Sequence, residues 1–376
     1  MRIALLTCHF PPDSIGGAQV QSYRLCAALG KEHDVTVFAR DYTGRMPRVE
    51  KVGTFTMSRR VALRIPVLRS IVDLITGLLI IRQTRKDFDI YLSFQLQLAA
   101  TIAVMGALLF RIVGVVAPSG MEDFDFHPWY KRILQKFIYR YSSAILIQSE
   151  GIRKEFMREL SRNFRESSVR ELSSKIHLFP NLILDPHVID SQSALRKPTI
   201  IYVGRLVDYK GVEYLINAMH HVPSECELTI IGGGPDRRRL EKIAAGLAVR
   251  FVGEVPFDAV ASHISSAWLL VLPSLTENLP NVILEALNLG LPVIATSIGA
   301  IPEIIRHGWN GYLVEPRNDK QIAECINFLL SDREKYQSMR AVAQESVRRF
   351  TESTLSPKLA EELMTIVAAN VHIAHP

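Results

Sequence analysis

Cysteine is scarce in this sequence, with four residues in 376, and their spacing matches neither a metal site nor a disulfide framework. The four are Cys8, Cys26, Cys226 and Cys325. This usage indicates free thiols in a reducing compartment and predicts a cytoplasmic protein. The opening apolar run is too short for a signal peptide. The best candidate for a membrane span, the uncharged run from Leu96 to Leu109, is also too short.

The chain also lacks internal repeats, low-complexity segments and the motifs of nucleic-acid recognition. No helix-turn-helix, zinc finger or aromatic ribonucleoprotein motif is present, so we expect no nucleic-acid partner. Asp123 and Asp125 have the spacing of an Asp-x-Asp metal motif but not its surroundings. We therefore expect no metal and no other cofactor.

The charge is distributed unevenly along the chain, although the whole chain carries a formal net charge of +6. Residues 1–180 contain 26 Lys and Arg against 16 Asp and Glu, a net charge of +10. Residues 181–376 contain 18 against 22, a net charge of −4. A basic first half suits an anionic substrate or an anionic membrane surface.

Short β-branched apolar runs alternate with amphipathic helical runs along the chain, which is typical of parallel sheets covered by helices on both faces. At 376 residues the chain is longer than a single domain with one hydrophobic core usually is, so two domains are expected. The fold class we predict is α/β, with two Rossmann-like doubly wound domains facing across a cleft. We predict a first domain over 1–185, a second over 186–350, and a C-terminal helix over 351–376 that packs back on the first. The predicted strands are Arg2–Thr7, Asp34–Ala39, Asp89–Ser93, Ile112–Ala117, Ala144–Gln148, Lys175–Phe179, Thr199–Val203, Glu227–Ile231, Val249–Val252, Leu269–Leu272, Pro292–Thr296 and Tyr312–Val314.

Glycine and charged residues follow several of these strands, at the sheet edge where ligands bind in doubly wound folds. Gly16 and Gly17 follow the first strand and form either a tight turn or a place where the backbone approaches a ligand. Arg205 and Lys210 follow the first strand of the second half. They are either solvated surface charges or cations that neutralise a diphosphate.

Two glutamates flank the start of a predicted helix. Glu277 lies in the loop after the strand Leu269–Leu272, and Glu285 lies about one turn into the helix that begins at Pro280-Asn281. The free amides and the dipole of a helix N-terminus attract phosphate, and carboxylates accept hydrogen bonds from hydroxyl groups. This arrangement suits a nucleotide-sugar.

The combined set of segments resembles that of the retaining glycosyltransferases of family four, the glycosyl transferases group 1, which have the GT-B fold. The resemblance covers nearly the whole chain and implies an acceptor-binding first domain and a nucleotide-sugar-binding second domain. The segments that carry it are Gly16-Gly17, Phe179 to Asn181, Gly204 to Gly211, Ile231 to Pro235, Glu277 to Glu285, Gly290 to Thr296, Gly299 to Glu303 and Asn310 to Val314.

The resemblance implies a role for each site residue. Arg205 and Lys210 would bind the donor diphosphate, Glu285 the ribose hydroxyls, and Glu277 the hydroxyls of the transferred sugar. The base would meet the backbone near Gly253 and Glu254. The backbone that would line the phosphate and sugar belongs to Gly16, Gly17, Asn278, Leu279, Pro280, Asn281 and Val282.

The implied reaction transfers a sugar from a UDP- or GDP-linked donor to a glycan or a lipid-linked acceptor, with retention at the anomeric carbon. A retaining glycosidase needs two carboxyl groups, one of them a nucleophile. The resemblance implies instead attack on the same face as the leaving diphosphate, which helps to deprotonate the acceptor. The residues predicted to carry catalysis are Arg205, Lys210 and Glu277.

One position departs from the family pattern. Family members have a histidine near the donor sugar, and Ser119 occupies that place here; Glu122, Asp123 and His127 lie close enough in sequence to share its role. This departure keeps open an inactive nucleotide-sugar-binding protein, and a related fold keeps open a sugar-nucleotide 2-epimerase. The pairing of two cations with two glutamates favours the transferase.

A basic and apolar stretch from Arg59 to Lys86 contains seven Lys and Arg residues and a single acidic residue, Asp73. Its centre, Ile71 to Ile81, is apolar on most of its helical circumference. It is either a core helix with charged ends or a helix that rests on an anionic membrane to reach a lipid-linked acceptor.

Overall fold

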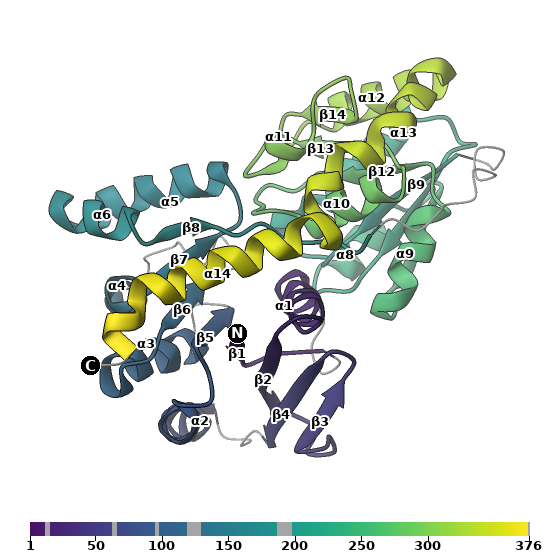
Figure 1. Ribbon diagram of the computed structural model, residues 1–376. Helices are drawn as coiled ribbons and strands as arrows, with labels where there is room; N and C mark the ends of the chain where they lie inside the picture. The colour runs from purple at the N-terminus through teal and green to yellow at the C-terminus, as the bar shows by residue number, and fades with distance from the viewer. Residues whose placement is uncertain (12–15, 62–65, 95–97, 119–128, 186–197, 375–376) are drawn as a thin grey trace. The chain divides into compact units, whose positions relative to one another are not determined.

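The computed structural model describes residues 1–11, 16–61, 66–94, 98–118, 129–185 and 198–374 (Figure 1). The chain forms two compact units. Unit 1 contains residues 1–182 and 352–376, and unit 2 contains residues 183–351.

Unit 1 contains an eight-stranded sheet in the order β3-β4-β2-β1-β5-β6-β7-β8. All neighbouring strands are parallel except the antiparallel pair β3 and β4. The central strands are buried on both faces, which explains their continuous apolar sequences. The strands are β1 (Arg2–Leu6), β2 (Asp34–Asp41), β3 (Val49–Val52), β4 (Phe55–Val61), β5 (Ile90–Phe94), β6 (Gly114–Ala117), β7 (Ala144–Ile147) and β8 (Ile176–Leu178).

The helices of unit 1 include one from the far end of the chain. That helix, α14, is yellow in Figure 1 and contacts α1. An ion pair and a hydrogen bond fasten it: Lys31 Nζ lies 2.5 Å from Glu352 Oε1, and His177 Nδ1 lies 2.5 Å from Glu362 Oε1. The helices are α1 (Gly17–Leu29), α2 (Pro66–Thr84), α3 (Leu98–Phe110), α4 (Trp129–Tyr141), α5 (Glu150–Asn163), α6 (Glu166–Ser173) and α14 (Glu352–Ala374).

The hairpin of β3 and β4 was not among the predicted strands. Phe55 and Met57 are buried and alternate with polar residues, and Gly53 has a φ of +55° in the turn. This is the pattern of a half-buried strand after a hairpin turn. The stretch from Arg59 to Lys86 is therefore not one helix: Arg59 lies in β4, where its buried side chain pairs with Glu50.

Unit 2 contains a six-stranded parallel sheet in the order β11-β10-β9-β12-β13-β14. Its strands β9, β10 and β12 begin and end at the predicted residues. The strands are β9 (Thr199–Val203), β10 (Glu227–Ile231), β11 (Val249–Gly253), β12 (Leu269–Leu272), β13 (Val293–Thr296) and β14 (Gly311–Val314). The α-helices are α7 (Val212–Ala218), α8 (Arg237–Ile243), α9 (Phe257–Ser265), α10 (Asn281–Asn288), α11 (Ile301–Ile304), α12 (Asp319–Ser331) and α13 (Arg333–Val347), and the 3₁₀ turns are η3 (Asp208–Lys210), η4 (Met219–His221) and η5 (Arg348–Phe350).

The prediction of two doubly wound α/β domains is confirmed. In unit 2 the strand order reverses at β9, since β10 follows it on one side and β12 lies on the other. Ligands bind at such a switch point, beyond the carboxyl ends of the strands. Among the described residues, no helix combines the length and apolar character that crossing a bilayer requires.

Candidate functional site

Two loops meet at the switch point of unit 2, because β9 and β12 are hydrogen-bonded neighbours. The loop after β9 contains Arg205 and Lys210, and the loop after β12 contains Glu277. The backbone amide of Leu275 donates to the carbonyl of Tyr209 at 2.8 Å and ties the two loops together. Residues far apart in sequence are therefore held side by side.

Gly211 explains how closely these loops approach. It has a φ of +62° between η3 and α7, and a Cβ there would lie 2.2 Å from the carbonyl oxygen of Pro273. Any other residue would meet both a strained backbone and a backbone clash. The glycine after Lys210 is thus a packing requirement of the site.

The centre of the site is an ion pair between Lys210 and Glu277. Lys210 Nζ lies 2.6 Å from Glu277 Oε1, and the two side chains are 20% and 10% exposed. The hydroxyl of Ser274 donates to the same Oε1 at 2.8 Å, and the hydroxyl of Thr296 donates to the carbonyl of Ser274 at 2.6 Å. Glu277 is therefore held from two directions in a mostly dry environment, where charge interactions are strong.

The segment around Gly299 supports the backbone of Glu277. Gly299 has a φ of +51°, and a Cβ there would lie 2.0 Å from the carbonyl oxygen of Glu277. The amide of Ala300 donates to the carbonyl of Asn278 at 3.1 Å. Gly299 and Ser274 were not predicted as site residues. The sequence signals that could have identified them are a glycine before a short predicted helix and a serine three residues before Glu277.

Helix α10 begins at Asn281, four residues after Glu277, as predicted. Its N-cap is Pro280, with no side-chain capping bond and no acidic residue in the first turn. The dipole of a helix is positive at its N-terminus, so this end of α10 attracts an anion such as phosphate. The side-chain oxygen and nitrogen of Asn278 are buried without a hydrogen-bond partner among the described residues. Glu285 lies about one turn further on and is half-buried.

Glycines of the segment after β10 shape the loop that carries Arg205. A Cβ on Gly232 would lie 1.9 Å from the carbonyl oxygen of Gly204, and one on Gly234 would lie 2.3 Å from that of Leu206. The hydroxyl of Tyr202 donates to the carbonyl of Arg205 at 3.0 Å, while the Arg205 side chain is exposed. Burial, and then the negative charge of Glu277, raise the pKa of Tyr202, so it stays a neutral donor.

The predicted base-binding residues lie at the carboxyl end of β11, in the same unit: Gly253 is its last residue and Glu254 follows it. Gly253 has a φ of +94°, and Glu254 is exposed. The amide of Gly232 donates to the carbonyl of Gly253 at 2.8 Å, which joins this segment to the glycines after β10 that shape the loop of Arg205. All predicted site residues of the second domain thus lie at the carboxyl edge of one sheet.

The predicted site residues of unit 1 are Gly16 and Gly17. Gly16 has a φ of −156°, an extended conformation that any residue adopts, and α1 begins at Gly17 without a side-chain cap. Ser119, Glu122, Asp123 and His127 lie outside the described residues.

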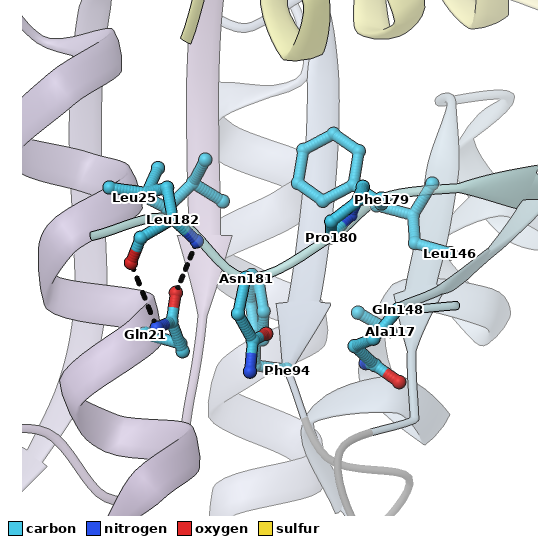
Figure 2. A pocket seen from close by; sticks show the side chains of 10 residues that line it. All are labelled: Gln21, Leu25, Phe94, Ala117, Leu146, Gln148, Phe179, Pro180, Asn181 and Leu182. Atoms are coloured by element: carbon cyan, nitrogen blue, oxygen red, sulfur yellow. Dashed lines mark hydrogen bonds between the residues drawn. The ribbon is translucent and has the colours of Figure 1, made fainter. Parts of the chain in front are cut away.

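A small hollow lies beside the carboxyl ends of β5, β6 and β7 in unit 1 (Figure 2). Its volume is about 10 Å³, enough for roughly one water molecule. Gln21 of α1 lies on its rim and forms two 3.0 Å hydrogen bonds with the backbone of Leu182. Nε2 of Gln148 donates to the carbonyl of Pro118 at 2.5 Å, and its buried Oε1 has no partner among the described residues.

Comparison with known proteins identifies a family model and several relatives. Residues 187–346 match the family model described as glycosyl transferases group 1. Sulfoquinovosyl transferase SQD2 of Arabidopsis thaliana is 33% identical over 169 residues, which are 44% of this chain and 33% of that protein. The GDP-mannose-dependent alpha-(1-6)-phosphatidylinositol monomannoside mannosyltransferase of Mycobacterium tuberculosis is 34% identical over 182 residues, 44% of this chain and 47% of that protein.

The matched segments therefore span less than half the length of these two curated relatives. The likeness in structure extends further. The sucrose-phosphate synthase of Thermosynechococcus elongatus has a TM-score of 0.83 and 21% identity, with 98% of this chain and 99% of that one covered. At this identity the likeness concerns the fold, and that fold is GT-B.

Proposed function

We propose that this chain, of which residues 187–346 match the glycosyl transferases group 1 model, transfers a sugar from a UDP- or GDP-linked donor to a glycan or a lipid-linked acceptor. One observation carries the proposal. The Lys210–Glu277 ion pair lies at the switch point of unit 2, next to the uncapped start of α10. A cation, a helix N-terminus and a carboxylate in one place suit a diphosphate joined to a sugar.

Each group has a proposed task in binding the donor. Arg205 and Lys210 hold the diphosphate with the first amides of α10, and Glu285 accepts from the ribose hydroxyls. Glu277 accepts from hydroxyls of the sugar with the lone pairs that Lys210 and Ser274 leave. The base lies by Gly253 and Glu254.

We propose that transfer proceeds with retention and without an enzymic nucleophile. Both bonds to Glu277 Oε1 favour a role in holding the sugar over nucleophilic attack. The bond from the anomeric carbon to the diphosphate oxygen breaks, and the acceptor oxygen attacks from the same face. The acceptor proton passes to the departing diphosphate, whose charge is stabilised by Arg205, Lys210 and the amides.

Arg205 and Lys210 take the role that a metal ion has in other phosphate-transfer sites, so we propose that the reaction needs no metal. With a panel of UDP- and GDP-sugars, one donor should release its nucleoside diphosphate in the presence of an acceptor extract. The rate should remain within about twofold after treatment with EDTA, because side chains and amides supply the positive charge. Loss of activity with EDTA, restored by Mg²⁺ or Mn²⁺, would contradict metal independence.

We further propose that unit 1 contacts an anionic membrane through α2 and α4. Ile71, Ile75 and Leu79 are exposed at a spacing of four residues on α2, one face of the helix. The exposed basic residues after them are Arg82, Arg85 and Lys86. On α4, Ile133 and Leu134 are exposed among the exposed Lys131, Arg132 and Arg140. Apolar side chains among cations are typical of interfacial helices.

Vesicle flotation tests the membrane proposal. The protein should float with vesicles containing phosphatidylglycerol, less with phosphatidylcholine alone, and less as salt increases. Ile71→Asp/Ile75→Asp should lose binding, while Met364→Asp, a change at an exposed apolar residue on α14, should not. Equal flotation of the three proteins, or none with either vesicle, would remove this part of the proposal.

A further inference from the structure

Two aromatic rings are stacked at the carboxyl edge of the unit 1 sheet. His9 follows β1 and Tyr42 follows β2, and these strands are parallel neighbours. Their ring centroids lie 4.9 Å apart with an interplanar angle of 6°. Tyr42 is 37% exposed, so the stack is open to solvent on part of its surface. Ligands of doubly wound sheets bind at this edge.

Two arginines contact Tyr42, and a third is the register partner of one of them. Arg40 and Arg60 are register partners at the carboxyl ends of β2 and β4. Nη1 of Arg40 donates to the hydroxyl of Tyr42 at 3.0 Å. The guanidinium carbon of Arg69, from the start of α2, lies 5.8 Å from the centroid of the Tyr42 ring, within the range of a cation–π contact.

The carboxylates nearby offset only part of this charge. Asp73 pairs with Arg40 at 2.6 Å, and this contact holds α2 against β2. The buried carboxylate of Asp41 accepts from the amides of residues 43, 44 and 46 and organises its own loop. Within the described part of the chain, Arg60 and Arg69 have no ion-pair partner. Burial, and then the charges of Arg40 and Arg69, lower the pKa of His9. The positive charge of both guanidiniums is therefore felt at the His9 ring.

We propose that this arginine–aromatic cluster, defined as His9, Arg40, Tyr42, Arg60 and Arg69, binds a phosphate group carried by the acceptor. The inference rests on the proposed transferase function, which assigns the acceptor to unit 1. The planar fork of arginine matches phosphate oxygens two at a time, and the open side of the His9–Tyr42 stack offers an apolar surface for the attached group. The acceptor is therefore a phosphorylated sugar or a phosphate-bearing lipid.

A structural role accounts for only part of the cluster. Arg40 joins β2 to α2 through Asp73 and reaches Tyr42, so its removal would disturb packing. Arg60 is exposed at the end of its strand, and Arg69 touches the rest of the cluster through the Tyr42 ring. These two can be changed with Arg40 kept, and they carry the test.

The test measures binding of two phosphate probes by the full chain. Glucose 6-phosphate and glucose are titrated by calorimetry, and flotation compares vesicles of phosphatidylglycerol and phosphatidylcholine. The wild type should bind at least one phosphate probe over its neutral counterpart. Arg60→Gln/Arg69→Gln should weaken that binding at least about tenfold, since hydrogen bonds to charged groups are lost. Arg60→Lys/Arg69→Lys keeps the charge but loses the planar guanidinium, so its affinity for the probe should lie between those of the wild type and Arg60→Gln/Arg69→Gln.

Arg158→Gln/Arg170→Gln is the matched control, since it removes the same charge from exposed sites on α5 and α6. It should bind both probes as the wild type does. Preference for glucose 6-phosphate alone indicates a soluble sugar phosphate, and a preference for phosphatidylglycerol alone that Arg60→Gln/Arg69→Gln removes indicates a lipid. Equal binding of phosphate and neutral probes by the wild type would overturn the proposal. So would a loss of affinity in Arg158→Gln/Arg170→Gln as large as that in Arg60→Gln/Arg69→Gln.

Titration of UDP and GDP into the same preparations separates this inference from the transferase proposal. The proposed nucleotide site consists of residues of unit 2 and the two arginines belong to unit 1, so Arg60→Gln/Arg69→Gln should leave nucleotide affinity within about twofold. A protein that binds UDP or GDP but neither phosphate probe refutes the phosphate site alone. A protein that binds a phosphate probe but no nucleotide refutes the transferase proposal instead.

Discussion

Replacing Lys210 with alanine is expected to lower turnover at least about 100-fold, because it removes a cation that stabilises the departing diphosphate. The change also leaves the Glu277 carboxylate, 10% exposed, without its ion-pair partner. An unpaired carboxylate near the phosphate would repel the charge that develops there. Steady-state rates of nucleoside diphosphate release, measured at saturating donor, give the effect on kcat.

Lys320→Ala serves as the control for this variant. Lys320 is an exposed lysine of α12 in the same unit, and its removal changes the net charge equally. Its turnover should stay within about twofold of the wild type, as surface substitutions usually do. Near-normal turnover of Lys210→Ala would remove this lysine from the proposed mechanism.

Replacing Glu277 with alanine should also lower turnover by at least about 100-fold. The carboxylate both holds Lys210 and is proposed to accept from the sugar hydroxyls. Glu277→Gln keeps the shape and an acceptor oxygen but loses the charge, so it should retain more activity than Glu277→Ala. Glu345→Gln, an exposed change on α13, should behave as the wild type. The measurement is the pH-independent kcat of each of the three variants, compared with that of the wild type.

The two residues should act as one unit. Their ion pair at 2.6 Å predicts that Lys210→Ala/Glu277→Ala is only about tenfold slower than the slower single variant. Effects that multiply in the double variant would show that each residue contributes independently. Thermal unfolding of each variant checks that lost turnover does not reflect lost folding.

The sequence predicted the sheets well where burial dominates. Strands β9, β10 and β12 are short apolar runs buried in the middle of the unit 2 sheet, so composition alone determines their limits. The hairpin of β3 and β4 lies at a sheet edge, where polar residues alternate with Phe55 and Met57. Its weaker pattern was obscured by the basic residues that follow. The pairing of buried Arg59 with Glu50 depends on that hairpin and could not be predicted without it.

The candidate site was predicted in its parts but not in its geometry. The family resemblance assigned Lys210 and Glu277 to one site, and the structure shows these residues in contact. They lie 67 residues apart, so their contact depends on β9 and β12 being neighbours. The support from Gly299 arises from backbone proximity, which spacing along the chain does not reveal.

The most direct test of a nucleotide-sugar site in unit 2 is calorimetric titration of UDP- and GDP-sugars into the wild type and Lys210→Ala. One nucleotide class should bind the wild type, and at about 100 times its Kd it should stabilise the fold by roughly 2.7 kcal/mol. Lys210→Ala should bind that donor at least about tenfold more weakly, because a charge-assisted bond to the diphosphate is lost. Absence of binding by every UDP- and GDP-sugar, or unchanged affinity in Lys210→Ala, would contradict the account.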